Sequence, residues 1–204
     1  MRAYLALVVL ALAVACTRLP EPAEYFKQKG VAVPRPERFT VCHGYDCTYR
    51  SEIELTAAEW ASVRALFQPL PATAAAERRA IGAAVALLER QVGQRIGTSA
   101  DTPGLAYIAA GDPTQQDCID ESTNTTLYLT LLSEAGLMQR HAVTSVASRG
   151  VFLDLRWYHQ TAVVRERNSG EEWVVDSWFK GNGEPPVIVT LHAWQTSYGQ
   201  PDGG

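Results

Sequence analysis

The feature that most limits the fold of this chain is a series of short apolar or alternating runs beyond residue 140. Turn residues such as Asn168-Ser169-Gly170 separate the runs, which are typical of strands with a buried face. Successive strands joined by short turns pair in antiparallel order. The predicted strands are His141–Ser148, Gly150–Leu155, Gln160–Glu166, Trp173–Trp178 and Val187–Leu191.

Helices are predicted before these strands. Thr56-Ala57-Ala58-Glu59 forms a capping box that begins one helix, and a longer helix is predicted from Thr73 to Val92. The charged residues of the longer helix, Arg78 and Glu89 among them, are expected to face solvent. Helices followed by consecutive strands predict an α+β fold with an antiparallel sheet.

Composition indicates a globular chain with one domain. The 204 residues are 47% hydrophobic and 20% charged, which is enough apolar material for one core. The formal net charge is −4. Because an acidic protein is repelled by phosphate groups, we expect no nucleic-acid partner.

The N-terminal segment is typical of a short secretory leader. Arg2 precedes an almost wholly apolar stretch from Ala3 to Ala15, which is too short to cross a membrane as a helix. The sequence Leu12-Ala13-Val14-Ala15-Cys16 resembles the lipobox of bacterial lipoproteins, in which the cysteine is lipidated. We therefore expect residues 1–15 to be a signal peptide and Cys16 to carry lipid. Ordinary cleavage after a small residue, with Cys16 incidental, is the alternative.

A tether is predicted between the lipid and the domain. Prolines recur between Pro20 and Pro36 among charged residues, and this composition favours extended chain. We assign residues 16–38 to the tether and residues 39–204 to the domain. The expected location is the bacterial cell envelope, as a periplasm-facing lipoprotein anchored in the outer membrane more readily than in the inner membrane.

Two predicted strands, Phe39–His43 and Cys47–Leu55, flank a turn at Gly44-Tyr45-Asp46. Cys42 and Cys47 lie on either side of this turn, and an oxidising compartment favours a disulfide between them. A zinc site that adds the neighbouring histidine is one alternative, and two free thiols are another. We expect the disulfide, and no metal or other cofactor.

Cys118 is a candidate nucleophile. Asp117 is a good N-cap, Asp120 occupies the third helical position, and helix-compatible residues continue to Gly136. The thiol would lie at the positive end of a helix, which favours the nucleophilic thiolate. The Asp117 carboxylate opposes a thiolate unless it is turned away as a cap. A small core residue with no chemical role is the alternative for Cys118.

His159 and Asp176 are the candidate partners of this thiol. His159 begins one predicted strand and Asp176 ends the next, so an antiparallel hairpin would bring them together. The imidazole could then take the thiol proton, and the carboxylate could fix the imidazole tautomer. Trp157 and Trp178 are expected either to line a substrate groove or to pack in the hairpin.

Residues just before Cys118 could complete the site. The stretch 97–113 is rich in turn residues and is predicted to form one wall of a cleft. Gln115 and Gln116 are candidate oxyanion donors beside the backbone N–H of Cys118. Surface glutamines without that role are the alternative.

The order of these residues resembles the transglutaminase-like superfamily, in particular the bacterial transglutaminase-like cysteine proteinases. The match is carried by Asp117-Cys118-x-Asp120, His159 and Val174-Val175-Asp176, within roughly residues 107–179. The resemblance implies a papain-like core, with the cysteine-bearing helix packed on an antiparallel sheet. It also implies Cys118 as nucleophile, His159 as general base and acid, and Asp176 as orienting residue. Ile119 stands where those proteinases usually carry an acidic residue.

These observations lead to three functional hypotheses. The first is an exported thiol peptidase or amide hydrolase that acts on a peptide or protein through an acyl-enzyme. The second is a catalytically silent binding module of the cell envelope, and the third is a structural lipoprotein with an incidental buried cysteine. The membrane is an expected partner in each case, through the lipid.

The leader generates a testable prediction. Cys16→Ala should release the protein from the membrane fraction or leave it unprocessed, because the thioether to lipid forms on that sulfur. Fractionation and intact mass of the mature N-terminus measure this. A soluble periplasmic wild-type protein with an unmodified N-terminus would refute lipidation.

Overall fold

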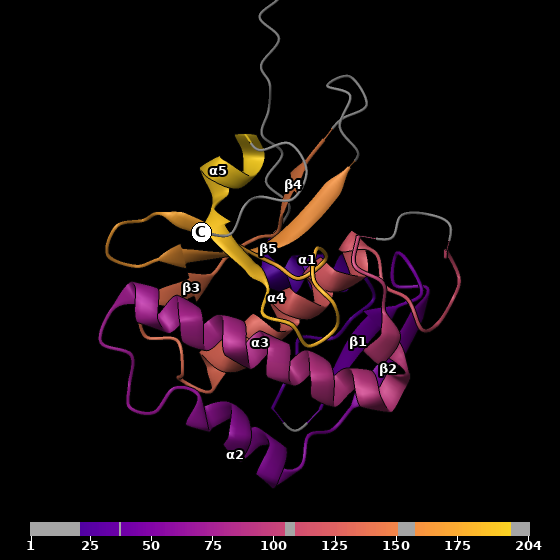
Figure 1. Cartoon of the computed structure of the whole chain (residues 1–204), viewed down its shortest axis with the longest axis horizontal. Helices are drawn as coiled ribbons and strands as arrows, with labels where there is room; N and C mark the ends of the chain where they lie inside the picture. Colours follow the sequence, from indigo (N-terminus) through magenta and orange to yellow (C-terminus); the bar gives the residue numbers. More distant parts are fainter. Residues whose placement is uncertain (1–20, 37, 105–108, 151–157, 197–204) are drawn as a thin grey trace, which may run out of the picture.

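The structure is a computed structural model that describes residues 21–36, 38–104, 109–150 and 158–196 (Figure 1). The described chain is mixed α+β, as expected. Its helices are α1 (Pro22–Gln28), α2 (Ala57–Ala65), α3 (Ala74–Ile96), the short 3₁₀ helix η1 (Thr98–Ala100), α4 (Cys118–Glu134) and α5 (Leu191–Thr196). Its strands are β1 (Phe39–His43), β2 (Tyr49–Ile53), β3 (His141–Val143), β4 (Ala147–Arg149), β5 (His159–Glu166), β6 (Glu172–Asp176) and β7 (Val187–Thr190).

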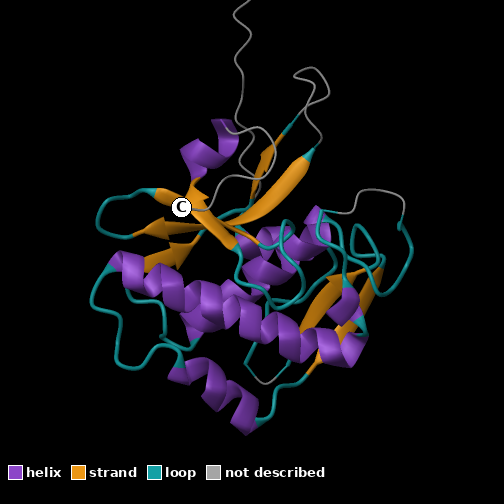
Figure 2. Ribbon diagram, in the orientation of Figure 1, coloured by secondary structure: helices purple, strands orange, loops and turns teal. Residues whose placement is uncertain are grey.

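The strands form two antiparallel sheets. β1 and β2 make a hairpin, and the larger sheet has the order β3-β5-β6-β7, with β4 also paired to β5. Figure 2 shows the sheets as separate groups of strands, with the long helix α3 running across the front of the molecule, and α4 contacts strands of both sheets. β5 is the central strand of the larger sheet, and α4 packs against it.

The predicted strand 141–148 is interrupted by a β-bulge. β3 pairs with the second half of β5, up to Val143 opposite Val164, and β4 resumes with Ala147 opposite Thr161. Residues 144–146 therefore face only residues 162 and 163, so one extra residue is inserted. The predicted strand Gly150–Leu155 lies outside the described residues, apart from Gly150.

α4 is buried along most of its length although it is rich in threonine and other polar residues. It contacts β5, β1 and α3. Several of its hydroxyl groups are satisfied within the helix: Thr123 donates to the Ile119 carbonyl at 2.6 Å, and Thr126 donates to the Ser122 carbonyl at 2.6 Å. Buried polar groups must be paired in this way, and here the pairing allows a polar helix to occupy the interior.

The prediction of an extended tether for residues 16–38 is wrong for Pro22–Gln28, which form the helix α1. Pro22 stands in the first turn of this helix, where its fixed φ is compatible with helix. Tyr25 and Phe26 are buried in the main core, and the Tyr25 hydroxyl lies 2.8 Å from Thr123 Oγ1. The burial of these two aromatic side chains attaches the segment to the domain, although its proline content suggested an extended chain. Residues 1–20, including the leader and Cys16, lie outside the described residues.

Two further features differ from the expectation. Glu89, expected in solvent, is buried, and its Oε2 accepts from the Gly183 backbone N–H at 3.1 Å. The predicted strand 187–191 ends at Thr190, and the short helix α5 follows. Within the described residues, helices that combine enough length and apolar character to cross a bilayer are absent.

The packing of α1 generates a prediction. Phe26→Ala should lower the free energy of unfolding by about 3–5 kcal/mol, because it removes a fully buried ring. Urea denaturation measures the loss, and Lys27→Ala on the exposed side of the same helix is the matched control. Equal stability of the two variants would mean that α1 does not pack on the domain.

Candidate active site

Cys118 is the first residue of α4, and a reciprocal capping box fixes its surroundings. Asp117 Oδ1 accepts from the backbone N–H groups of Ile119 at 3.0 Å and Asp120 at 2.9 Å. The Asp120 carboxylate in turn accepts from the Asp117 backbone N–H at 3.4 Å. The predicted capping box is therefore present, and the Cys118 backbone N–H is not one of its donors.

His159 and Asp176 form a direct hydrogen bond. The register that pairs Ala162 with Val175 places Asp176 opposite Thr161, on the same sheet face as His159. His159 Nε2 lies 2.7 Å from Asp176 Oδ2. Because a carboxylate only accepts, Nε2 carries the proton of the neutral ring, and Nδ1 is left as the basic nitrogen. Nδ1 is buried and has no hydrogen-bond partner among the described residues.

Trp194 is a third member of this arrangement. Its indole Nε1 donates to Asp176 Oδ2 at 2.7 Å, and its ring centroid lies 5.5 Å from that of His159. The side chain is fully buried, and the Arg149 guanidinium lies 4.4 Å from the ring centroid. Asp176 is thus held from two directions. No role was predicted for Trp194, because nothing in the sequence indicates that the short helix after the last strand folds back over the site.

The thiol lies beside the start of β5. The backbone N–H of Gln160, next to His159, interacts with the Cys118 sulfur, and the charge of Asp176 also acts on it. The structure therefore brings all three predicted residues to one region, where α4 meets β5 and β6. The sulfur and His159 Nδ1 are not hydrogen-bonded to each other in this state.

The Cys118 thiol is neutral in this environment. Burial raises the pKa of the thiol to about 12, and the Asp117 carboxylate adds to the rise. The Gln160 N–H lowers the pKa but does not offset burial. The expected stabilisation of a thiolate by the helix N-terminus is therefore outweighed by desolvation. Any nucleophilic attack must transfer the proton during the reaction.

Aromatic rings surround the imidazole. The ring centroids of Trp178 and Phe179 lie 4.6 and 5.0 Å from that of His159. These contacts exclude water from the His159–Asp176 bond and strengthen it. The packing role considered for Trp178 is therefore present, while Trp157 lies outside the described residues.

Gln115 and Gln116 hold the chain before α4 in place. The Gln115 amide donates to the Ala100 carbonyl at 3.3 Å and accepts from the Thr102 N–H at 3.0 Å. The Gln116 amide is buried and donates to the Cys42 carbonyl at 3.2 Å. Both side chains fasten neighbouring segments, so neither is carried forward as an oxyanion donor.

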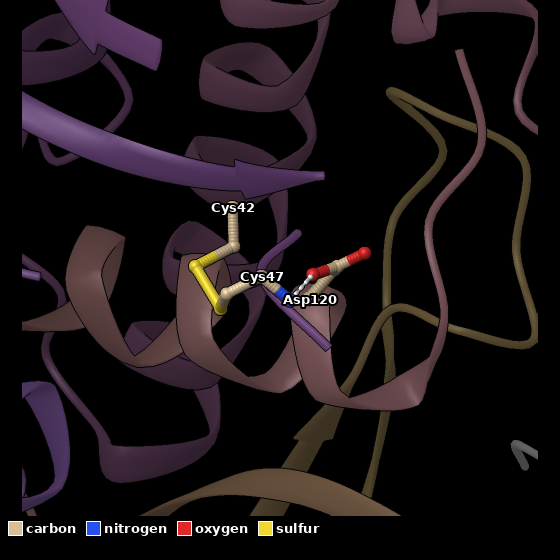
Figure 3. A group of neighbouring side chains, drawn as sticks. All are labelled: Cys42, Cys47 and Asp120. Carbon is tan, nitrogen blue, oxygen red and sulfur yellow. Dashed lines mark hydrogen bonds between the residues drawn. A yellow bond between two sulfur atoms is a disulfide. The ribbon is translucent and has the colours of Figure 1, made fainter. Parts of the chain in front are cut away.

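Cys42, Cys47 and Asp120 lie together at the tip of the β1–β2 hairpin (Figure 3). A disulfide joins the two cysteines, the pairing that the sequence favoured. One possible ligand atom from each of the three residues lies within 4.8 Å of the others. Because the two sulfurs are bonded to each other, neither offers a thiolate to a metal. His43 uses both ring nitrogens on a backbone carbonyl and a serine hydroxyl, so it does not complete a zinc site.

Additional carboxyl groups are buried behind the cysteine. Burial raises the pKa of Asp101 and of Glu89 to about 7. Burial and the charges of Glu89 and Asp101 raise the pKa of Glu121, one turn beyond Cys118, well above its usual range. The charges that raise the pKa of the Cys118 thiol are instead those of Asp117 and Asp176.

No family model, curated protein or solved structure matches this chain.

The neutral thiol generates a pH prediction. With its pKa raised to about 12, Cys118 should react with iodoacetamide at a rate that rises about tenfold per pH unit between about pH 6 and 10. An ordinary thiol levels off near its pKa of about 8.5, and a preformed thiolate reacts at a constant rate in acid. Peptide-resolved mass spectrometry measures the labelling.

His159→Gln is the matched control for this profile, because it keeps a polar side chain that cannot become a cation. The slope should be the same in both proteins. A plateau in the wild type that His159→Gln removes would mean that the resting state is a thiolate–imidazolium pair.

Proposed function

We propose that the protein is a thiol hydrolase of the transglutaminase-like type, which cleaves a peptide or amide bond through an acyl-enzyme. The observation that carries the proposal is the imidazole of His159, whose Nε2 is fixed by Asp176 while its buried Nδ1 lacks a partner. Cys118 supports it, since the sulfur lies at the adjoining backbone of β5. A nucleophile, a base and a group that orients the base are the parts of such a catalyst.

The first half of the reaction forms a thioester. His159 Nδ1 takes the Cys118 proton as the sulfur attacks the carbonyl carbon, which fits a thiol that is neutral at rest. The Cys118 backbone N–H takes no part in the cap and acts on its own sulfur, where it would meet an oxyanion that develops beside that sulfur. The C–N bond then breaks, and the leaving amine departs with the proton from His159.

Water completes the cycle. His159 Nδ1 takes a proton from water as its oxygen attacks the thioester, and the proton returns to the sulfur as the acid leaves. Asp176 stabilises the imidazolium in both halves, and Trp194 keeps the carboxylate in position. Transfer to an amine in place of water would need exclusion of water from the acyl-enzyme.

The cellular setting belongs to the same proposal. We infer an exported lipoprotein, anchored through Cys16 and facing the periplasm, whose substrate is a peptide or protein. The disulfide between Cys42 and Cys47 supports an oxidising compartment.

A catalytically silent binding module is the second candidate. The observation that favours it is the neutral, buried thiol, which is not hydrogen-bonded to His159 in this state. Such a module would bind peptide at the same place without cleaving it.

The triad prediction separates the two candidates. Cys118→Ser should abolish hydrolysis, because a hydroxyl is far less acidic and less nucleophilic than a thiol. His159→Ala should lower the rate roughly 10²–10⁴-fold by removing the proton carrier. Asp176→Asn should cost less than either, but still at least about tenfold, because the ring keeps a neighbour while losing its preferred tautomer.

Hydrolysis of fluorescently labelled casein and the intact mass of an acyl adduct on Cys118 are the measurements. His192→Ala, on the exposed face of α5, is the matched control and should keep full activity. Wild-type cleavage that survives Cys118→Ser would exclude Cys118 as the nucleophile. Peptide binding without cleavage in the wild type would favour the silent module.

A further inference from the structure

The tip of the β1–β2 hairpin has an unusual backbone. Gly44, Tyr45, Asp46 and Cys47 have φ angles of 79°, 74°, 48° and 53°, all in the left-handed region. Residues with a side chain adopt this region with difficulty, and three of the four carry one. At Gly44 a Cβ atom would lie 2.3 Å from the Tyr49 ring, so only glycine fits. A conformation of this kind persists only when its surroundings hold it.

The left-handed turn binds a carboxylate. Consecutive backbone N–H groups in such a turn point inward and form an anion receptor. Here the anion is the side chain of Asp120, which accepts from the Tyr45 and Cys47 N–H groups at 2.7 Å each. Figure 3 shows the bond from Cys47 beside the disulfide. Asp120 is fully buried, so water does not replace these donors.

The same turn also holds the other side of the nucleophile. The Asp46 N–H donates to Asp117 Oδ2 at 3.2 Å. Asp117 and Asp120 are the two members of the capping box around Cys118. The turn therefore fixes the carboxylates that fix the first turn of α4.

The disulfide joins the two ends of the turn, and each end is also hydrogen-bonded to α4. Cys42 is tied to α4 through Asn124, whose side chain accepts from the Cys42 N–H at 2.7 Å and donates to its carbonyl at 2.8 Å. Cys47 is tied to Asp120. The bridge between Cys42 and Cys47 thus joins two anchors on one helix and keeps the turn between them in its strained form.

We propose that the Cys42–Cys47 disulfide is a redox-sensitive positioning element for Cys118, which keeps the thiol buried at the capped helix start, and that its reduction raises the rate at which the thiol is alkylated. The proposal rests on the role of Cys118 in the proposed function. With the bridge intact, the turn presents its amides to Asp117 and Asp120 and the helix start is fixed. With the bridge open, the turn relaxes from the left-handed region and withdraws these donors.

The reduction is a two-electron step. A dithiol such as dithiothreitol supplies two electrons and two protons, leaves as its cyclic disulfide, and converts the bridge to two thiols. Asp120 then loses the donors that offset its burial. The Cys47 and Tyr45 N–H groups lower the pKa of this carboxyl, which burial and Asp117 raise to about 7. A buried carboxyl without them must protonate or move, and either change disturbs the cap around Cys118.

The test compares the oxidised full chain, the chain reduced by dithiothreitol and desalted without air, and the Cys42→Ser/Cys47→Ser double variant. Amide hydrogen exchange reports on the contacts without reference to catalysis. The amides of Tyr45, Cys47, Ile119 and Asp120 should exchange about tenfold faster or more when the bridge is open, as expected for loss of a hydrogen bond to a charged group. Alkylation of Cys118 at constant pH should become about threefold faster or more in the same samples, roughly the effect of half a pKa unit, because a loosened cap relieves the burial that keeps the thiol neutral.

A second variant tests whether the disulfide acts on Cys118 through Asp120. Asp120→Asn keeps the size of the side chain but sets an amide group against one of its two donors. It should reproduce the faster alkylation, and opening the bridge in this variant should add little, because both changes remove the same contact. Glu52→Gln, which breaks the ion pair with Arg38 at the open end of the hairpin, is the matched control and should alter neither readout.

Each outcome decides the proposal. Unchanged exchange at the turn and the helix start after reduction would overturn it, as would faster exchange with unchanged alkylation. Additive effects of Asp120→Asn and reduction would overturn the route through Asp120. If both readouts respond while Cys118→Ser retains hydrolysis, the positioning of the thiol stands and the proposed function fails.

Discussion

The burial of the polar start of α4 is the constraint on which the rest of the structure depends. Asp117, Cys118 and Asp120 are drawn out of water at the positive end of a helix, where every donor and acceptor needs a partner. The hairpin turn supplies amides from one side, and β5 supplies the Gln160 N–H from the other. The folding of the hairpin, of the helix and of the sheet is therefore tied to one cluster of contacts. The cluster also contains the only cysteine of the described residues outside the disulfide.

The position of the imidazole follows from strand pairing. β5 and β6 pair antiparallel from Ala162 onward, so the side chains of His159 and Asp176 meet diagonally on one face. β4 pairs with the beginning of β5 after the bulge at residues 144–146 has shifted the register by one residue. Trp194, in the helix α5 that follows β7, donates a further hydrogen bond to the Asp176 carboxylate. Three separate connections thus converge on a single hydrogen bond of 2.7 Å.

The sequence predicted the parts of this arrangement that depend on local chemistry. The capping box, the strands β5 and β6, and the disulfide turn each have a signature within a few residues. Parts that depend on distant packing were missed. The helix α1 was not predicted because prolines lie in and around it, although Tyr25 and Phe26 pack in a core formed by later segments. Glu89 resembled an exposed residue of an amphipathic helix, because its partner Gly183 lies far along the sequence, in the connection between β6 and β7.

Charge explains why the site needs its imidazole. Burial, followed by the charges of Asp117 and Asp176, raises the pKa of the Cys118 thiol to about 12. A free thiolate there would lack a counter-charge, so the helix N-terminus alone does not activate the thiol. A proton moved to His159 Nδ1 would place a cation between the sulfur and Asp176, and it would balance a negative charge on each side. Asp176, whose charge helps to suppress the resting thiolate, would thus also stabilise an imidazolium formed during an attack.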